Sequence, residues 1–74
     1  METSKRVTEI RRELNITQAE LGRRLDESIQ YINKVESGAI NLKQATMIKL
    51  YQRLRVNLNW LLTGEGARFI SPQD

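Results

Sequence analysis

Residues 17–38, TQAELGRRLDESIQYINKVESG, contain two short helix signals separated by very few residues. Thr17 is followed three positions later by Glu20, the capping-box pattern in which each side chain satisfies the backbone amide of the other residue. Ser28 is a natural N-cap for a second helix, and Gly38 is a natural C-terminal cap. About three residues join the two expected helices, and so tight a connection predicts a helix-turn-helix.

Helical patterning extends on both sides of this segment. Near the N-terminus, Val7, Ile10 and Leu14 recur at the spacing of one buried helix face. Asn41 begins a further cap pair, and Asn57 caps a last short helix. The chain therefore reads as all-α, with helices expected over residues ~4–14, ~17–24, ~28–36, ~42–54 and ~57–63 and an irregular tail.

The expected inner faces of these helices are mostly apolar. For the second and fourth helices, the inward residues are Leu21, Gly22, Leu25, Met47, Leu50, Tyr51 and Leu54. Trp60 is assigned to the core, because its spacing with Leu61 is typical of packing and not of stacking on bases. Arg11 falls on the inner face of the first helix, where a buried charge needs a partner.

Size and composition narrow the possible functions. With 74 residues, no histidine and no cysteine, the chain has room for one small domain and lacks the commonest general base and metal ligand. We therefore expect no enzymatic activity, cofactor, metal or small-molecule substrate. A formal charge of +3 permits nucleic-acid binding. Because its longest apolar run is only Trp60-Leu61-Leu62, we expect a cytoplasmic protein without a membrane segment.

The outward face of the helix expected at residues ~28–36 carries groups suited to reading DNA. Ile32, Val35 and Glu36 cluster on its inner side. Its outer side presents Ile29, Gln30, Tyr31, Asn33 and Lys34. Amide side chains pair with adenine, lysine pairs with guanine, and an apolar side chain contacts the thymine methyl group. The alternative is a solvated face, with Ile29 packed on the preceding helix and Tyr31 shielding the core rim.

The residues from Arg6 to Gly64 resemble the Cro and lambdoid-phage repressor family of helix-turn-helix DNA-binding domains. The resemblance is strongest in LNITQAELGRRLDESIQYINKVESG and LRVNLNWLLTG, with their Thr-Gln-x-x-Leu-small, Glu-x-Gly and Trp-Leu-Leu-x-Gly patterns. It implies a five-helix lambda-repressor-like domain of residues 1–66 and a C-terminal tail of residues 67–74. It also implies a bacterial, phage or prophage regulator that binds a roughly palindromic double-stranded DNA operator as a homodimer.

The resemblance also assigns roles to single residues. Gly22 stands where the family needs a small residue between two helices, and Asp26 stands where the turn requires a positive φ. Arg11 and Glu36 match a buried ion pair that ties the first helix to the third; the alternative is an arginine that reaches solvent. The implied DNA phosphate contacts are Thr17, Gln18, Ser28, Ser37, Lys43 and Arg23, of which Arg23 is alternatively only a solubilising charge.

Position 29 departs from the family pattern, in which a glutamine reads a base and braces the first glutamine of the second helix. Ile29 cannot make that contact, so we expect it to meet a thymine methyl group or no base. The loop before the fourth helix also lacks the family's proline. The candidates for a dimer contact are Leu58, Leu62, Phe69 and Ile70; alternatively, Phe69 and Ile70 fold back over their own core.

The leading hypothesis is a sequence-specific transcriptional regulator that represses by occupying a promoter. The length suits a self-contained Cro-like protein and equally the N-terminal domain of a longer phage-type repressor. The alternative function is that of an antitoxin of a toxin–antitoxin pair, which binds both DNA and a partner protein. A steep fall of affinity with salt is expected if DNA is bound through phosphates.

Overall fold

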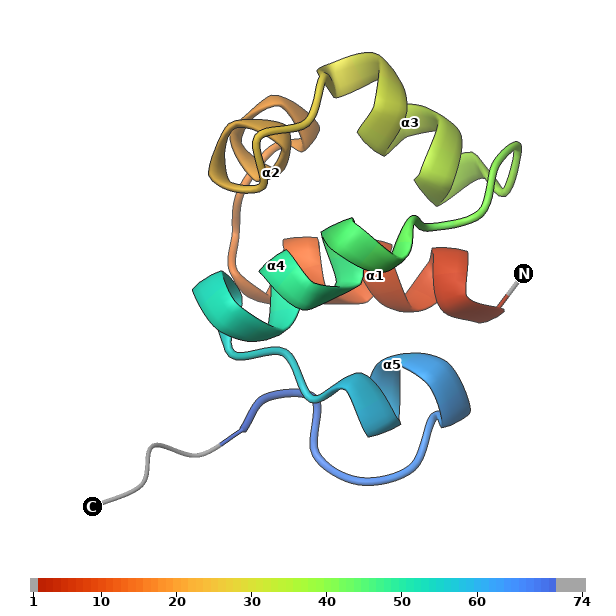
Figure 1. Cartoon of the computed structure of the whole chain (residues 1–74), viewed down its shortest axis with the longest axis vertical. Coiled ribbons are helices and arrows are strands. Elements are labelled where there is room, and N and C mark those ends of the chain that lie inside the picture. The colour runs from red at the N-terminus through yellow and green to blue at the C-terminus, as the bar shows by residue number, and fades with distance from the viewer. Residues whose placement is uncertain (1, 71–74) are drawn as a thin grey trace.

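Five helices make up the described part of the chain. The structure is a computed structural model and describes residues 2–70. Its helices are α1 (Glu2–Glu13), α2 (Gln18–Arg24), α3 (Ile29–Ser37), α4 (Gln44–Leu54) and α5 (Leu58–Thr63) (Figure 1). Within residues 2–70 the only β structure is an isolated antiparallel bridge between Val56 and Phe69. The expected all-α, five-helix fold is confirmed, and each helix boundary lies within about two residues of its expected position.

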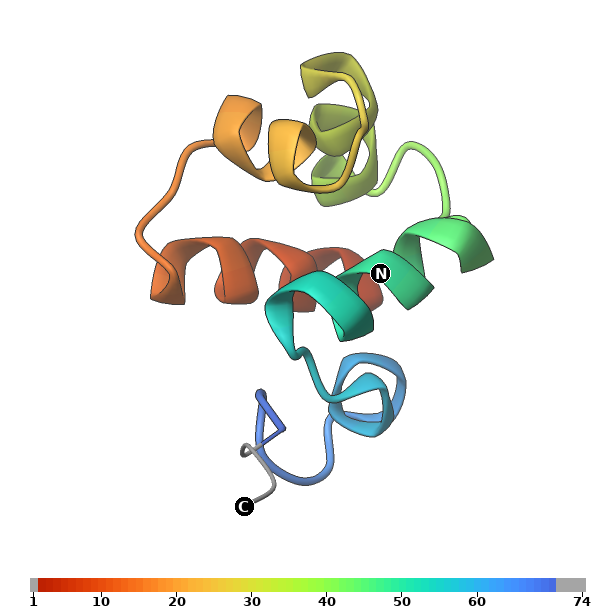
Figure 2. The same cartoon turned by 60° about the vertical axis from the view of Figure 1, so that its left-hand side comes forward.

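The helices lie at three levels. Figures 1 and 2 both show α2 and α3 at the top, α1 and α4 in the middle, and α5 at the bottom. α1 contacts both α3 and α5 and therefore connects the two ends of the domain. As a result, α3 packs one face on the domain and leaves its other face at an open end.

The hydrophobic core draws residues from every helix. Its buried members are Val7, Ile10, Leu21, Leu25, Ile32, Val35, Leu42, Leu50, Val56, Trp60 and Leu61. Trp60 is only 7% exposed, which confirms its assignment to the core. Truncation of such a large buried side chain to alanine typically costs about 2–5 kcal/mol, so this core fixes the relative positions of the helices.

The turn between α2 and α3 places two helices in very close contact. Asp26 has φ of 54°, so the positive φ predicted for this turn is confirmed. Glu27 N donates to the Gly22 carbonyl at 2.7 Å. A Cβ atom on Gly22 would lie 2.6 Å from the Glu27 carbonyl oxygen. Glycine at this position therefore permits the backbone to close the turn.

The capping box at Thr17 is only half formed. Thr17 Oγ1 accepts from Glu20 N at 3.1 Å and caps α2, as expected. The Glu20 carboxylate does not reach back to the Thr17 amide but accepts from Arg23 Nε at 3.0 Å and Arg24 Nε at 2.9 Å. Arginines three and four residues along a helix lie over the same face, so their charges attract this carboxylate away from the cap.

α4 begins two residues later than expected. Its N-cap residue is Lys43, which makes no side-chain cap hydrogen bond, and the predicted cap at Asn41 is wrong. The buried stripe of α4 is centred on Thr46 and Leu50, at 0% and 1% exposure. Tyr51, predicted to face inward, lies at the edge of this stripe and is 48% exposed. A threonine is tolerated in the core because its hydroxyl has hydrogen-bond partners there.

Residues 65–70 contain no helix and fold back onto the domain. Asn57 N donates to the Arg68 carbonyl and Ile70 N to the Arg55 carbonyl, each at 2.8 Å. Phe69 packs against the core cluster, as the alternative reading of this segment expected. Residues 67–70, which we assigned to a tail, therefore contact the domain, while residues 71–74 of that tail lie outside the described residues.

Candidate nucleic-acid interface

α3 carries its outward side chains on a fixed backbone. Ser28 Oγ accepts from the Tyr31 amide at 3.0 Å and caps the start of the helix, and Gly38, with φ of 84°, ends it. Ile32 and Val35 are buried and hold α3 on the core. The exposed residues of the outward face are Ile29, Gln30, Asn33 and Lys34. Four of the five residues predicted to contact bases therefore stand in solvent.

These side chains surround one shallow hollow. Its volume is about 300 Å³, and it is lined by Gln18, Ile29, Gln30, Asn33 and Lys34. Ile29 is 45% exposed and stands outside the core cluster. An aliphatic group thus lies beside two amides and an ammonium group, which is the combination needed to contact a methyl group and polar base edges together.

A largely buried ion pair anchors the far end of α3 to α1. Arg11 Nε donates to Glu36 Oε2 at 2.8 Å, and Arg11 Nη2 donates to Glu36 Oε1 at 3.1 Å. The two side chains are 17% and 6% exposed. Arg11 Nη1 also donates to the Ile16 carbonyl at 3.0 Å. The guanidinium therefore joins α1, the loop before α2 and the end of α3, and it does not extend into solvent.

Gln18 lies between this ion pair and the outward face of α3. Its Nε2 donates to Glu36 Oε1 at 3.1 Å, and its Oε1 accepts from Asn33 Nδ2 at 3.4 Å. The family resemblance suggested that Gln18 would lack its usual hydrogen-bond partner at position 29, because that residue is isoleucine. The structure shows that Glu36 and Asn33 brace it instead. No sequence pattern pointed to these contacts, because Gln18 lies 15 positions from Asn33 and 18 positions from Glu36.

Tyr31 faces α4, so we no longer assign it a base contact. Its hydroxyl oxygen accepts from Lys43 N at 2.9 Å and lies 3.4 Å from Thr46 Oγ1. Lys43 Nζ lies 4.6 Å from the centre of the Tyr31 ring, within cation–π range. These contacts correspond to the alternative reading, in which the ring covers the core rim. The prediction did not consider that the Tyr31 hydroxyl could form hydrogen bonds with residues at the start of α4.

Glu27 completes this polar cluster and was missed by sequence reasoning. Thr46 Oγ1 donates to Glu27 Oε2 at 2.8 Å, and Lys43 Nζ donates to Glu27 Oε1 at 3.2 Å. The Glu27 side chain is only 9% exposed. The carboxylate thus links the turn of the helix-turn-helix to the first turn of α4. The position of Glu27 just before the α3 cap did not predict its contacts with Thr46 and Lys43.

The residues predicted to contact phosphate differ in what they can still offer. The hydroxyl oxygens of Thr17 and Ser28 accept from backbone amides, which leaves their protons available to a phosphate oxygen. Ser37 Oγ donates to the Lys34 carbonyl at 3.0 Å, so its proton is already engaged. Lys43 shares its charge with Glu27 but remains 57% exposed.

Arg23 is exposed but paired. The hydrogen bond from Arg23 to Glu20 is the largest cause, and that from Arg24 the next, of a pKa of the Glu20 carboxyl below its ordinary value. The same hydrogen bond raises the pKa of Arg23. The neighbouring carboxylate offsets part of the arginine's field, so Arg23 is a weaker candidate for phosphate contact than an unpaired cation would be.

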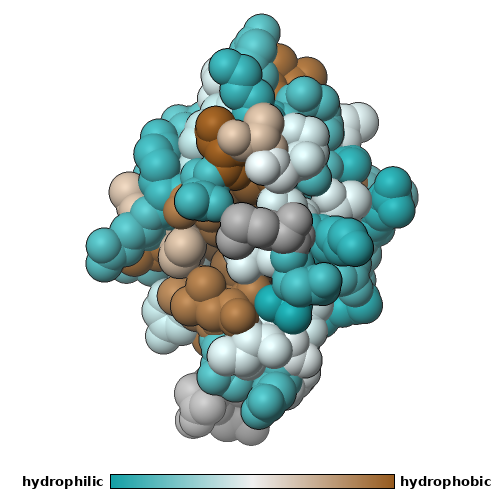
Figure 3. All heavy atoms as spheres, turned by 90° about the vertical axis from the view of Figure 1, so that its right-hand side faces the viewer, coloured by the Kyte–Doolittle hydropathy of each residue, from teal (hydrophilic) through white to brown (hydrophobic). Residues whose placement is uncertain are grey.

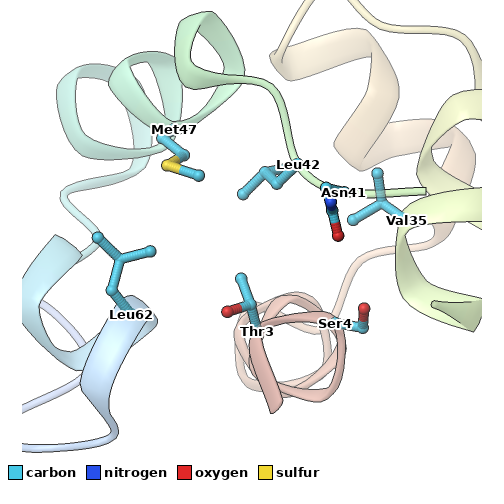
Figure 4. A pocket seen from close by; sticks show the side chains of 7 residues that line it. All are labelled: Thr3, Ser4, Val35, Asn41, Leu42, Met47 and Leu62. Carbon is cyan, nitrogen blue, oxygen red and sulfur yellow. The ribbon is translucent and has the colours of Figure 1, made fainter. Parts of the chain in front are cut away.

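A different surface lies where α1, α4 and α5 approach one another. A groove of about 200 Å³ is lined by Thr3, Ser4, Val35, Asn41, Leu42, Met47 and Leu62. Figure 4 shows Leu42, Met47 and Leu62 pointing toward a common space. Figure 3, which views the right-hand side of Figure 1, shows apolar surface near the middle of this face, bordered by hydrophilic residues. Leu62 is 52% exposed, whereas Leu58 and Phe69 pack on their own core.

Other kinds of site find little support in the described part of the chain. Residues 2–70 hold no group of three or more acidic side chains that could bind a metal ion. None of the five helices there has the length and hydrophobicity needed to cross a membrane. The hollows that these residues do form include the open face of α3 and the groove beside Leu62.

The comparisons with known proteins agree with this geometry. The family model described as Helix-turn-helix matches residues 7–61. Among solved structures, the chain is similar to the P22 c2 repressor protein, seen in a crystal structure in complex with synthetic operator 9T in the presence of Tl+. The similarity has a TM-score of 0.78 and 25% sequence identity, over 88% of this chain and 98% of that chain. No curated protein gives a significant match.

Proposed function

This chain belongs to the helix-turn-helix family, and on that premise we propose that it is a sequence-specific transcriptional repressor that binds double-stranded operator DNA. The observation that carries the proposal is the outward face of α3. Its backbone is fixed by caps and core contacts, while Gln30, Asn33 and Lys34 stand exposed around one hollow. An α-helix presented in this way fits the major groove. Neither the fold nor the comparisons favour the antitoxin alternative.

Sequence would be read by the four exposed residues of α3. Gln30 and Asn33 offer amides suited to adenine, and Lys34 offers an ammonium group suited to guanine. Ile29, 45% exposed at the hollow, would contact a thymine methyl group. Each good side-chain–base pair is worth about 1–3 kcal/mol of discrimination. These side chains would set specificity and not the bulk of the affinity.

Register on the DNA would come from contacts with phosphates. Thr17 and Gln18 stand at the start of α2, and Ser28 at the start of α3, where unpaired amides and the positive end of the helix dipole favour an anion. Lys43 would approach the DNA phosphates from the loop before α4. Arg23 would add to the field, and Ser37 would contribute through its amide or by releasing its present hydrogen bond.

The active form would be a homodimer on a roughly palindromic operator, with one α3 helix in each half-site. Support comes from the groove beside α5, because Leu62 is 52% exposed next to Leu42 and Met47. Such an apolar surface on a small domain favours contact with another copy. Of the other expected dimer contacts, Leu58 and Phe69 pack on their own core and Ile70 pairs with Arg55, so Leu62 is the main candidate. The repressor would act in the bacterial cytoplasm, associated with the nucleoid through DNA, and no catalytic step is proposed.

Selection of bound sites from random double-stranded DNA tests the function directly. We expect a symmetric sequence with half-sites one helical turn apart and an affinity that falls steeply with salt. Recovery of no common sequence, or an affinity that does not change with salt, would contradict the proposal.

A matched pair of variants separates base reading from net charge. Lys34→Gln removes a cation from the α3 surface, whereas Arg55→Gln removes one at the C-terminal cap of α4. That end of α4 lies away from α3 in Figures 1 and 2. Lys34→Gln should relax discrimination at one base position by about 1–3 kcal/mol. Arg55→Gln should leave the selected sequence unchanged. Equal losses on all sequences for Lys34→Gln would remove its assignment as a base contact.

A further inference from the structure

We propose that the buried Glu36 carboxylate fixes the donor and acceptor directions of the base-reading surface through Gln18, so that Asn33 reads adenine. This inference rests on the proposed DNA-binding function. It assigns Glu36 and Gln18 as specificity-positioning residues, beyond any role of Glu36 in stability.

The orientation begins at a group that can only accept hydrogen bonds. Glu36 is 6% exposed and receives two N–H groups from Arg11, at 2.8 Å and 3.1 Å. An ionised carboxylate has no proton to donate. Gln18, whose amide nitrogen lies 3.1 Å from Glu36 Oε1, must therefore turn its NH2 group toward Glu36.

This first orientation determines the second. With its NH2 group toward Glu36, Gln18 directs its amide oxygen toward Asn33. An amide oxygen only accepts, so Asn33 must turn its NH2 group toward Gln18, as the Nδ2–Oε1 distance of 3.4 Å indicates. An exposed asparagine is otherwise free to exchange its oxygen and nitrogen by rotation. The buried ion pair removes this freedom through two successive hydrogen bonds.

The fixed amide of Asn33 presents a defined pattern to a base. Its oxygen remains an acceptor, and its second N–H remains a donor. Adenine matches this pair in the major groove, because its N6 amino group donates and its N7 accepts. Guanine offers acceptors at both O6 and N7, so the same oxygen would face another oxygen. By contrast, within residues 2–70 no hydrogen bond holds the side chains of Gln30 or Lys34.

Base analogues and three variants test the chain of contacts. Asn33→Ala first identifies the position that Asn33 reads, which should be an A·T pair in the selected operator. Replacing that adenine with purine, which lacks the N6 amino group, should weaken binding of the unmodified protein by about five- to thirtyfold. In Gln18→Met, which removes the relay but keeps the Arg11–Glu36 pair, the same replacement should weaken binding by less than about threefold.

Glu36→Gln gives a second route to the same result. A glutamine at position 36 still accepts from Arg11 but can also donate to Gln18, so both amides regain the freedom to reverse. It should relax selectivity at the Asn33 position while leaving the Lys34 position unchanged. If this variant does not fold, as circular dichroism would show, Gln18→Met decides alone.

The outcomes are distinguishable. If the unmodified protein selects no sequence, the proposed function fails. If it selects a sequence but Asn33→Ala affects a G·C pair, the inference about adenine fails. If Gln18→Met discriminates adenine from purine as well as the unmodified protein does, the relay from Glu36 is overturned. A relaxation confined to the Asn33 position supports both steps.

Discussion

The two ends of this domain are stabilised by different chemistry. At the α2–α3 end, hydrogen bonds and ion pairs from Glu36 and Glu27 brace helices whose outer face is polar. At the α5 end, backbone pairing of residues 55–57 with residues 68–70 covers the core, and Leu62 is left exposed. A polar, oriented surface suits base edges, whereas an apolar one suits another protein surface. Under the proposed function, this difference would place DNA recognition and dimer contact on different surfaces of one small fold.

The largest expected effect on stability comes from breaking the brace at the α3 end. Glu36→Ala leaves the Arg11 guanidinium, only 17% exposed, without its partner. We expect a loss of about 3–5 kcal/mol in the free energy of unfolding, measured by urea denaturation. Glu20→Ala, which breaks exposed pairs on α2, should cost far less, because solvent screens these pairs. Similar losses for both would mean that burial of the Arg11–Glu36 pair has no special effect.

Gly22→Ala tests how closely the helices approach at the same end. Alanine favours a helix by up to ~1 kcal/mol over glycine. However, its Cβ would lie 2.6 Å from the Glu27 carbonyl oxygen, which is backbone and cannot rotate away. We expect a net loss of about 1–2 kcal/mol, since overpacking typically costs ~1–3 kcal/mol. A gain in melting temperature would show that the turn opens without cost.

Tyr31→Phe distinguishes a brace from a base contact. The change removes the hydroxyl that accepts from Lys43 N and lies near Thr46, so the free energy of unfolding should fall by about 0.5–1.5 kcal/mol. The operator selected from random DNA should stay the same. A changed preference at one base pair, without loss of stability, would restore Tyr31 to the base-reading set.

Glu20→Gln probes the exposed pairs through pH. The pKa of Glu20 is lowered in the folded state by Arg23 and then Arg24. The contribution of Glu20 to the free energy of unfolding is therefore present above its unfolded-state pKa and is lost as pH falls through its folded-state pKa. Thermal melts should show a small difference from the unmodified protein at neutral pH that disappears on acidification. A difference that grows in acid would have the wrong sign.

Leu62→Glu addresses the opposite end and should have the smallest effect on monomer stability. Because Leu62 is 52% exposed, we expect a change within about 0.5 kcal/mol in the free energy of unfolding. Sedimentation should nevertheless show weaker dimerisation, and affinity for a full palindrome should fall toward that for a half-site. Gln52→Glu, which introduces the same charge at an exposed position of α4 outside the groove lining, serves as a control. Unchanged sedimentation would place the dimer contact elsewhere.

Much of the fold could be predicted because its signals are local. Thr17, Ser28 and Asn57 cap their helices within three residues, and Gly38 and Gly64 end helices in the left-handed conformation. The exceptions arise from contacts across layers. The fourth helix starts at Gln44, two residues later than expected, and the Lys43 amide before it donates to Tyr31, twelve positions earlier in the chain.

The sequence by itself determined the five helices and the exposed face of α3, because caps and helical periodicity depend on neighbours a few residues apart. The positive φ of Asp26 followed from the family resemblance. Only the tertiary structure decided that Gln18 lies between Glu36 and Asn33 and that Tyr31 turns to α4. These partners are 12 to 18 positions apart. Their hydrogen bonds exist because packing brings side chains from different helices within reach of one another, and the largely buried Glu36 must pair with what the neighbouring helices present.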